Sequence, residues 1–115
     1  MQPEERDGAF LWDIYEAAKD IHDFVSRITV KEFRSDKKTR YAVERQLLVI
    51  GEAAKKVTEN FKQKHDEIPW RRIVGLRNIL AHEYGEILVE RIWLIATENI
   101  PSLINALEPL VPKNI

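Results

Sequence analysis

Residues 43–61, VERQLLVIGEAAKKVTENF, carry the most regular hydrophobic pattern in the chain. Apolar side chains recur there at alternating intervals of four and three residues: Val43, Leu47, Ile50, Ala54, Val57 and Phe61. A sustained repeat of this kind predicts a long helix packed in a bundle. Gly51 lies inside the repeat at a cost of about 1 kcal/mol relative to alanine, which suggests that another backbone or side chain approaches closely there.

Three further stretches have helical periodicity. Residues 10–28 and 87–110 place apolar side chains three and four positions apart. Residues 70–81 form another apolar arc, with Pro69 near its start, where the missing N–H costs little. Pro101 is expected to kink or restart the last helix, with Asn99 as a candidate cap. Four amphipathic helices with short connections predict an all-α, up-and-down antiparallel four-helix bundle.

The connections have their own signals. Thr29 and Glu32 match a capping box, which predicts an additional short helical turn whose Phe33 reaches the core. The segments 35–40 and 60–67 are polar, and we expect a solvated loop and a polar connection there.

Composition sets broad limits. The chain has 115 residues, enough for one core, so residues 1–115 are expected to form a single domain. It has no cysteine, which excludes disulfides and thiolate metal sites. A formal net charge of −1 argues against a general polyanion binder. The polar start shows no targeting signal and no apolar run approaches the length of a membrane span, so a cytoplasmic protein without a membrane partner is expected.

The octet 77–84, RNILAHEY, breaks the local pattern. In a helix over residues 70–81, Arg77 projects from the middle of the apolar arc, so it is either paired with a carboxylate or faces a cleft where an anion binds. Glu52, directly after Gly51, is the candidate partner. His82 follows five residues later and points about 140° away. The two side chains can converge if the helix ends near Ala81, with Gly85 as its C′ residue, or if two copies of the chain combine.

An arginine, a histidine and a tyrosine suit chemistry on a phosphodiester, since arginine binds phosphate oxygens and histidine moves protons. A structural ion pair and a histidine near a helix C-terminus explain the same residues without catalysis. Arg71 and Arg72 add two guanidiniums that could contact RNA phosphates, although solvated arginines in a first helical turn are an equal reading. His22 is expected at the surface, without a metal.

The octet and two upstream blocks together resemble the HEPN superfamily, and most closely its HepT-like ribonuclease toxins. The octet supplies Arg-x4-His-x-Tyr, residues 68–76 read IPWRRIVGL, and the third block joins AVER at 42–45 to IGEA at 50–53. The similarity runs from Arg6 to the final helix. Family members pair with a minimal nucleotidyltransferase antitoxin of the MntA type.

The resemblance implies a homodimer, with further assembly allowed, in which the motifs of two subunits line a cleft that cleaves RNA without a metal or cofactor. Arg77 would stabilise the scissile phosphate and His82 would act as general base or acid, with Asn78 assisting. Tyr84 matches the tyrosine that the antitoxin modifies with AMP.

Two other functions stay open at this stage. One is a non-catalytic HEPN-type module that complexes with a nucleotidyltransferase and binds nucleotide or substrate. The other is a purely dimeric scaffold. Neither requires both Arg77 and His82, so the intact pair favours the ribonuclease toxin.

Overall fold

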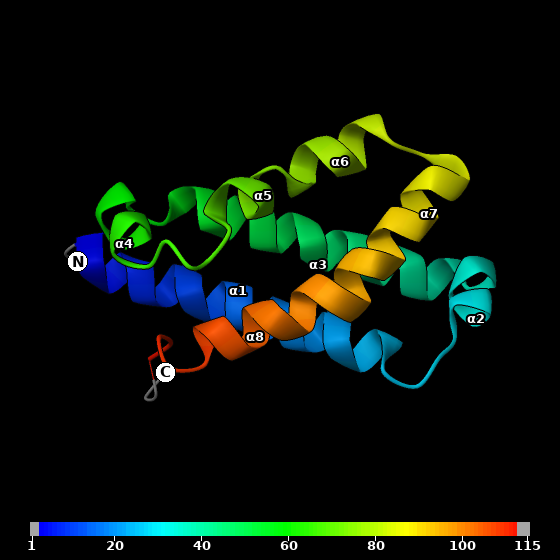
Figure 1. Cartoon of the computed structure of the whole chain (residues 1–115), viewed down its shortest axis with the longest axis horizontal. Helices are drawn as coiled ribbons and strands as arrows, with labels where there is room; N and C mark the ends of the chain where they lie inside the picture. The colour runs from blue at the N-terminus through cyan, green and yellow to red at the C-terminus, as the bar shows by residue number, and fades with distance from the viewer. Residues whose placement is uncertain (1–2, 113–115) are drawn as a thin grey trace.

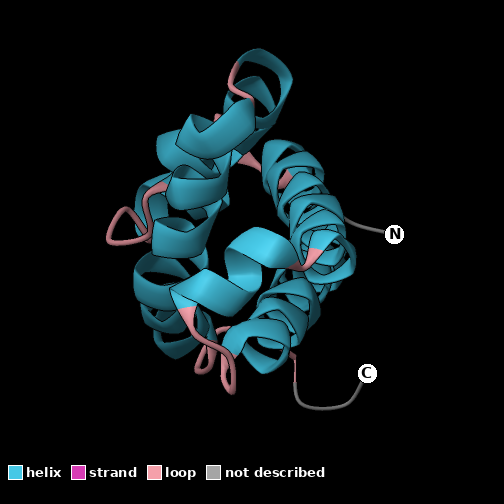
Figure 2. Cartoon of the chain, turned by 90° about the vertical axis from the view of Figure 1, so that its right-hand side faces the viewer, coloured by secondary structure: helices cyan, strands magenta, loops and turns pink. Residues whose placement is uncertain are grey.

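A computed structural model describes residues 3–112 of the chain, and this part consists of helices and connections without a strand (Figures 1 and 2). In chain order the helices are α1 (Pro3–Val25), α2 (Val30–Ser35), α3 (Lys37–Lys56), α4 (Glu59–Lys64), α5 (Trp70–Val74), α6 (Leu76–His82), α7 (Gly85–Leu94), the π-helical segment η1 (Ile95–Asn99) and α8 (Ile100–Leu107). The all-α prediction is confirmed. The assignment of residues 1–115 to one domain stays a prediction, since residues 1, 2 and 113–115 lie outside the described part.

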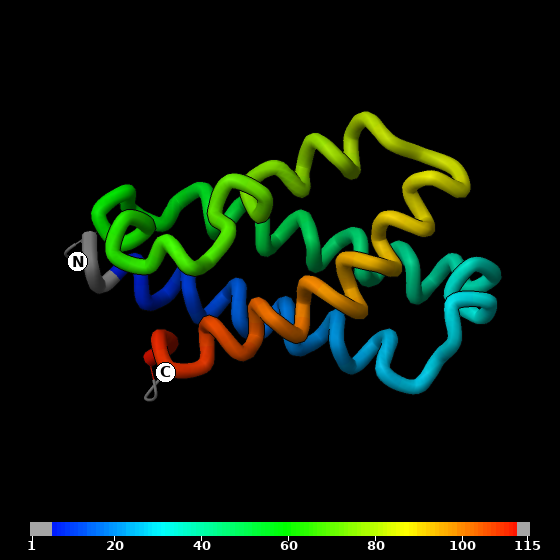
Figure 3. Tube along the Cα trace, viewed as in Figure 1, coloured from blue at the N-terminus to red at the C-terminus, as the bar shows by residue number. Residues whose placement is uncertain are grey.

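Four arms run alternately up and down the long axis of the molecule (Figures 1 and 3). The arms are α1, α3, the pair α5–α6, and the continuous rod α7–η1–α8. The most extensive packing joins α1 to α3; α5 and α6 pack on α3, and α8 packs on α1. Short helices α2 and α4 lie at opposite ends of the bundle. This arrangement confirms the predicted bundle.

The seam predicted in residues 43–61 is buried, but it spans two helices rather than one. Val43, Leu47, Ile50 and Ala54 are fully buried along α3. The helix then ends, and Phe61 belongs to α4. The break comes at Thr58, whose N–H and hydroxyl donate to the buried Asp7 carboxylate at 2.8 and 2.6 Å. A partner 51 residues away in sequence therefore holds Thr58, the N-cap of α4, in the turn that follows α3.

The Thr29–Glu32 capping box is confirmed. The Glu32 N–H donates to Thr29 Oγ1 at 3.2 Å, and the Thr29 N–H donates to Glu32 Oε1 at 3.1 Å. Phe33 is fully buried and its ring lies 5.2 Å from that of Trp93, so α2 supports α7.

The loop predicted at 35–40 is wrong, because Asp36 caps α3 and the helix begins at Lys37. The Asp36 carboxylate accepts from the Thr39 hydroxyl at 2.7 Å and from the Thr39 N–H at 3.1 Å. These hydrogen bonds favour the ionised form and lower the pKa of Asp36. The connection predicted at 60–67 is also largely helical, as α4.

The predicted restart at Pro101 is confirmed, because α8 begins at Ile100 with the proline in its first turn, although the arm continues without a loop. The turn before the proline widens into η1, a π-helical segment that accommodates a residue lacking an N–H donor. Thr97 Oγ1 donates to the carbonyl of Trp93 at 2.7 Å within this segment. The prediction of Asn99 as a cap is wrong, since its side chain makes no capping hydrogen bond. Among residues 3–112, no helix combines the length and apolar character that a membrane span needs.

Candidate active site

The third arm, α5–α6, lies against α3 at Gly51. The sequence predicts that another part of the chain approaches closely at this glycine. A Cβ atom at this position would lie 3.3 Å from the carbonyl oxygen of Ile73 and 3.9 Å from the backbone nitrogen of Arg77. Glycine therefore lets the junction of α5 and α6 rest directly on the α3 backbone. The next residue, Glu52, is consequently within reach of α6.

Arg77 pairs with Glu52, the partner proposed from the sequence. Arg77 Nη1 donates to Glu52 Oε1 at 3.5 Å, with the two side chains 65% and 44% exposed. The expectation that Arg77 emerges from a buried apolar arc is wrong, because the predicted helix breaks at Gly75 and Leu76 takes the inward position. An exposed pair of this length is worth about 0–1 kcal/mol, so a phosphate can replace the Glu52 carboxylate.

Arg77 also faces a groove. A hollow of about 360 Å³ between α3 and α6 is lined by Arg77 together with Glu44, Arg45, Leu48, Leu80 and Ala81. Burial raises the pKa of the Glu44 carboxyl, an effect that Arg40 opposes. The two alternatives for Arg77, an ion pair or a cleft, are therefore both realised.

His82 and Tyr84 flank the corner between α6 and α7. His82 is the exposed last residue of α6, and Tyr84, 82% exposed, precedes α7. Between them Glu83 accepts two hydrogen bonds from Arg91 of α7, at 2.9 and 3.3 Å. Gly85 has a φ of +68°, but it begins α7 instead of serving as the C′ residue of α6. The corner is thus fixed by an ion pair and a glycine while the side chains of His82 and Tyr84 remain open to solvent.

Arg77 and His82 do not converge within one chain by unwinding of the helix. The Glu83 N–H donates to the carbonyl of Ile79 at 3.0 Å, so helical geometry persists through His82. Five residues of helix separate the two side chains by about 140° around the axis. The helix ends close to Ala81, as one of the two routes requires, but its last turn keeps the two side chains on different sides of the axis.

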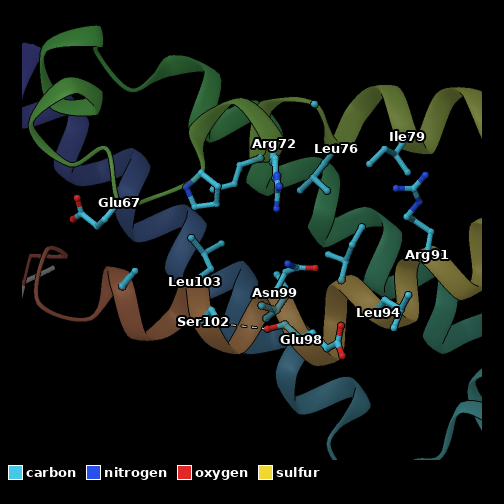
Figure 4. Close-up of a pocket in the computed structure, with 16 residues that line it drawn as sticks. Glu67, Arg72, Leu76, Ile79, Arg91, Leu94, Glu98, Asn99, Ser102 and Leu103 are labelled. Carbon is cyan, nitrogen blue, oxygen red and sulfur yellow. Dashed lines mark hydrogen bonds between the residues drawn. The ribbon is translucent and has the colours of Figure 1, made fainter.

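The other predicted residues are dispersed. Asn78, Arg71 and Arg72 are all exposed. Arg72 borders a larger cavity, of about 720 Å³, between α5–α6 and the η1–α8 rod, where it points across toward Asn99 (Figure 4). Neither Arg77 nor His82 lines this cavity. Arg72 and Arg77 therefore line different hollows.

Sequence reasoning assigned no role to Arg45, which shares the groove with Arg77. Its signal is the spacing of exposed and half-buried residues along α3, where Tyr41, Arg45, Leu48 and Glu52 recur at intervals of four, three and four. His22 is exposed, as predicted. Within residues 3–112 no three side chains of the kinds that bind metals are grouped to hold an ion.

Comparison with known proteins identifies the family of this chain. The family model described as "Ribonuclease HepT-like" matches residues 14–110. A putative RNase of Methanocaldococcus jannaschii is 43% identical over 109 residues, which cover 95% of this chain and 90% of that protein. A probable ribonuclease HepT of Thermococcus cleftensis is 43% identical over 101 residues, which cover 88% and 92%. No solved structure matches the chain.

Proposed function

The chain belongs to the HepT-like ribonuclease family, and from that membership we propose that its endoribonuclease activity resides in Arg77 and His82 at a cleft shared by two copies. One observation carries this proposal: both side chains are exposed on the short helix α6, yet they point in different directions around it. A second, symmetry-related α6 supplies the missing group to each phosphodiester.

The residues of the cleft suit attack by the RNA's own 2′-hydroxyl. His82 accepts the 2′-OH proton while the 2′ oxygen bonds to phosphorus and the bond from phosphorus to the 5′ oxygen breaks. The leaving 5′ oxygen takes a proton from water, and His82 releases the proton that it accepted, giving a 2′,3′-cyclic phosphate and a 5′-hydroxyl. Arg77 exchanges Glu52 for the phosphate oxygens and stabilises the charge that develops on them. DNA lacks the nucleophile and should remain intact.

Tyr84 gives the site a means of control. We place this chain in a toxin–antitoxin pair in which a nucleotidyltransferase transfers AMP from ATP to the Tyr84 hydroxyl, releasing pyrophosphate. The 82% exposure of Tyr84 and its position two residues after His82 support such a modification. The added phosphate and adenosine would occupy the cleft and compete for Arg77. The RNA substrate and the antitoxin place this proposed function in the cytoplasm.

The activity is tested with purified protein, single-stranded RNA and EDTA. The parent protein should cleave RNA, while Arg77→Ala and His82→Ala should each lose about 100-fold or more. The matched controls Arg27→Ala and His22→Ala replace exposed residues outside the site and should cleave normally. Absence of cleavage by the parent protein would overturn the catalytic assignment and favour a non-catalytic module that binds nucleotide for its partner.

The regulation is tested by intact mass after incubation with the cognate nucleotidyltransferase and ATP. The mass should rise by whole AMP units, and Tyr84→Phe should abolish the rise. Tyr41→Phe removes the hydroxyl of another exposed tyrosine and should leave the rise unchanged. An unmodified parent protein would remove Tyr84 from the account.

A further inference from the structure

We propose that Tyr41 and Arg45, on the outer face of α3, form a subsite for single-stranded RNA beside Arg77, in which Arg45 binds a backbone phosphate and Tyr41 stacks on a neighbouring base. The inference rests on the proposed ribonuclease function and extends it, because it identifies where the RNA strand continues beyond the scissile bond.

Arg45 occupies the centre of a hollowed surface. It lines the groove of about 360 Å³ that contains Arg77, and it also lines an adjacent hollow of about 210 Å³ whose other residues include Phe10, Glu52 and Lys56. Leu48 is likewise common to both hollows. The outer face of α3 therefore offers a path that leads away from Arg77 and passes Arg45.

The guanidinium of Arg45 is available to a ligand. Arg34, Arg77 and Arg91 each form an ion pair with a carboxylate. Arg45, by contrast, is exposed, and it forms neither an ion pair nor a hydrogen bond with any of the described side chains, those of residues 6–112. A phosphate that binds Arg45 does not have to displace a carboxylate, and arginine matches phosphate geometry with two parallel hydrogen bonds.

Tyr41 presents an aromatic ring one helical turn before Arg45, just beyond the residues that line the two hollows. It is 60% exposed, whereas Tyr15 is buried and donates its hydroxyl to Glu108 at 2.5 Å. Tyr41 precedes Arg45 by four residues of α3, or about 6 Å along the helix axis, so both can contact adjacent nucleotides. Stacking on an exposed aromatic ring is a common way of holding single-stranded RNA.

The charges around the subsite indicate that RNA is held by a few individual side chains and not by a uniformly basic surface. Glu44 and Glu52 lie close to Arg45 and Arg77, so the surface is not uniformly basic. General attraction of a polyanion is weak under these conditions. The strand is therefore held by its two arginine contacts and by the stacked base.

The test measures binding of a short, labelled single-stranded RNA to the full-length His82→Ala protein by fluorescence anisotropy. In this background Tyr41→Ala and Arg45→Ala should each weaken binding about tenfold, and Arg45→Ala should reduce the salt dependence by about one phosphate contact. Tyr41→Phe keeps the ring and should bind normally. Phe24→Ala and Arg27→Ala, exposed residues away from the groove, are the matched controls.

Three different results would overturn the proposed subsite, and only one of them would also overturn the proposed function. Normal binding by both variants, while the parent protein cleaves RNA, overturns the subsite alone. Lack of RNA binding and of cleavage by any form of the protein overturns the subsite together with the proposed function. If light scattering shows that Tyr41→Ala or Arg45→Ala separates the dimer, the face is a subunit contact and the subsite is also overturned.

Discussion

The α1–α3 pair and the corner between α6 and α7 differ in how their side chains are held. Along α3, Val43, Leu47, Ile50 and Ala54 are fully buried against the core. At the corner, His82 and Tyr84 are exposed, and an ion pair between Glu83 and Arg91 fixes the backbone between them.

This contrast separates two tasks within one small chain. Packing between long helices supplies the stability of the fold, because each fully buried aliphatic side chain contributes about 1.5–3 kcal/mol. Short helices with little buried surface leave polar side chains such as that of His82 exposed to solvent. Gly51 connects the two regions, since the corner's arm lies on the α3 backbone at that residue.

The largest effect is expected on the free energy of unfolding, when the same change, isoleucine to alanine, is made separately in each region. Ile50→Ala removes a fully buried side chain from α3 and should lower the free energy of unfolding by about 2–5 kcal/mol. Ile87→Ala trims a side chain that is 71% exposed in α7 and should change it by less than about 0.5 kcal/mol. Urea denaturation of both variants measures the difference, and equal losses would contradict the division between core and corner.

A smaller effect is expected when the corner loses its ion pair. Glu83→Gln should leave the free energy of unfolding within about 1 kcal/mol of the parent value. It should nevertheless lower kcat/KM for RNA by roughly tenfold, because the ion pair no longer holds the backbone next to His82 in place. Glu90→Gln, which breaks the exposed pair with Arg34 at 2.6 Å, is the matched control and should cleave RNA normally. Equal rates for the two variants would show that the Glu83–Arg91 pair does not position the site.

The smallest effect is expected at the start of α3, where one contribution to the free energy of unfolding should change with pH. The pKa of Asp36 is lowered in the folded protein, chiefly by the hydrogen bond from the Thr39 hydroxyl. The ionised carboxylate therefore stabilises the fold above its unfolded pKa, and this contribution is lost as pH falls through the lowered value.

The test follows urea denaturation from neutral pH into the acid range. The difference in free energy of unfolding between the parent and Asp36→Asn should shrink as pH falls. A difference that stays constant with pH would contradict the role of the Asp36 charge.

The sequence predicts those parts of the fold that depend on local signals. Apolar spacing identifies the four arms, and Thr29 and Glu32 identify the capping box. Helix ends that depend on distant partners are missed. Apolar periodicity continues past Lys56, but α3 ends there, and the buried Asp7 carboxylate holds Thr58 in the turn before α4. No pattern within residues 43–61 reports that contact.

The sequence indicates which residues belong to the candidate site more fully than it indicates where their side chains lie. Gly51 and Glu52 indicated where α6 meets α3, and the distance from Arg77 to Glu52 agrees. The break at Gly75 was missed, so Arg77 was expected on a buried arc. The sequence does not indicate that Arg45 and Arg77 line the same groove, because the groove forms only when α3 and α6 lie side by side. The catalytic, RNA-binding and modification roles remain predictions.

The central claim is that Arg77 of one copy and His82 of another act on the same phosphodiester. Its most direct test is RNA cleavage by a heterodimer in which one copy carries Arg77→Ala and the other His82→Ala, purified with two different tags. One of its two clefts keeps an intact arginine from one copy and an intact histidine from the other.

This heterodimer should recover about half of the activity of a doubly tagged parent dimer, although each variant alone is inactive. A heterodimer as inactive as the two variants, beside an active parent dimer, would contradict the shared cleft.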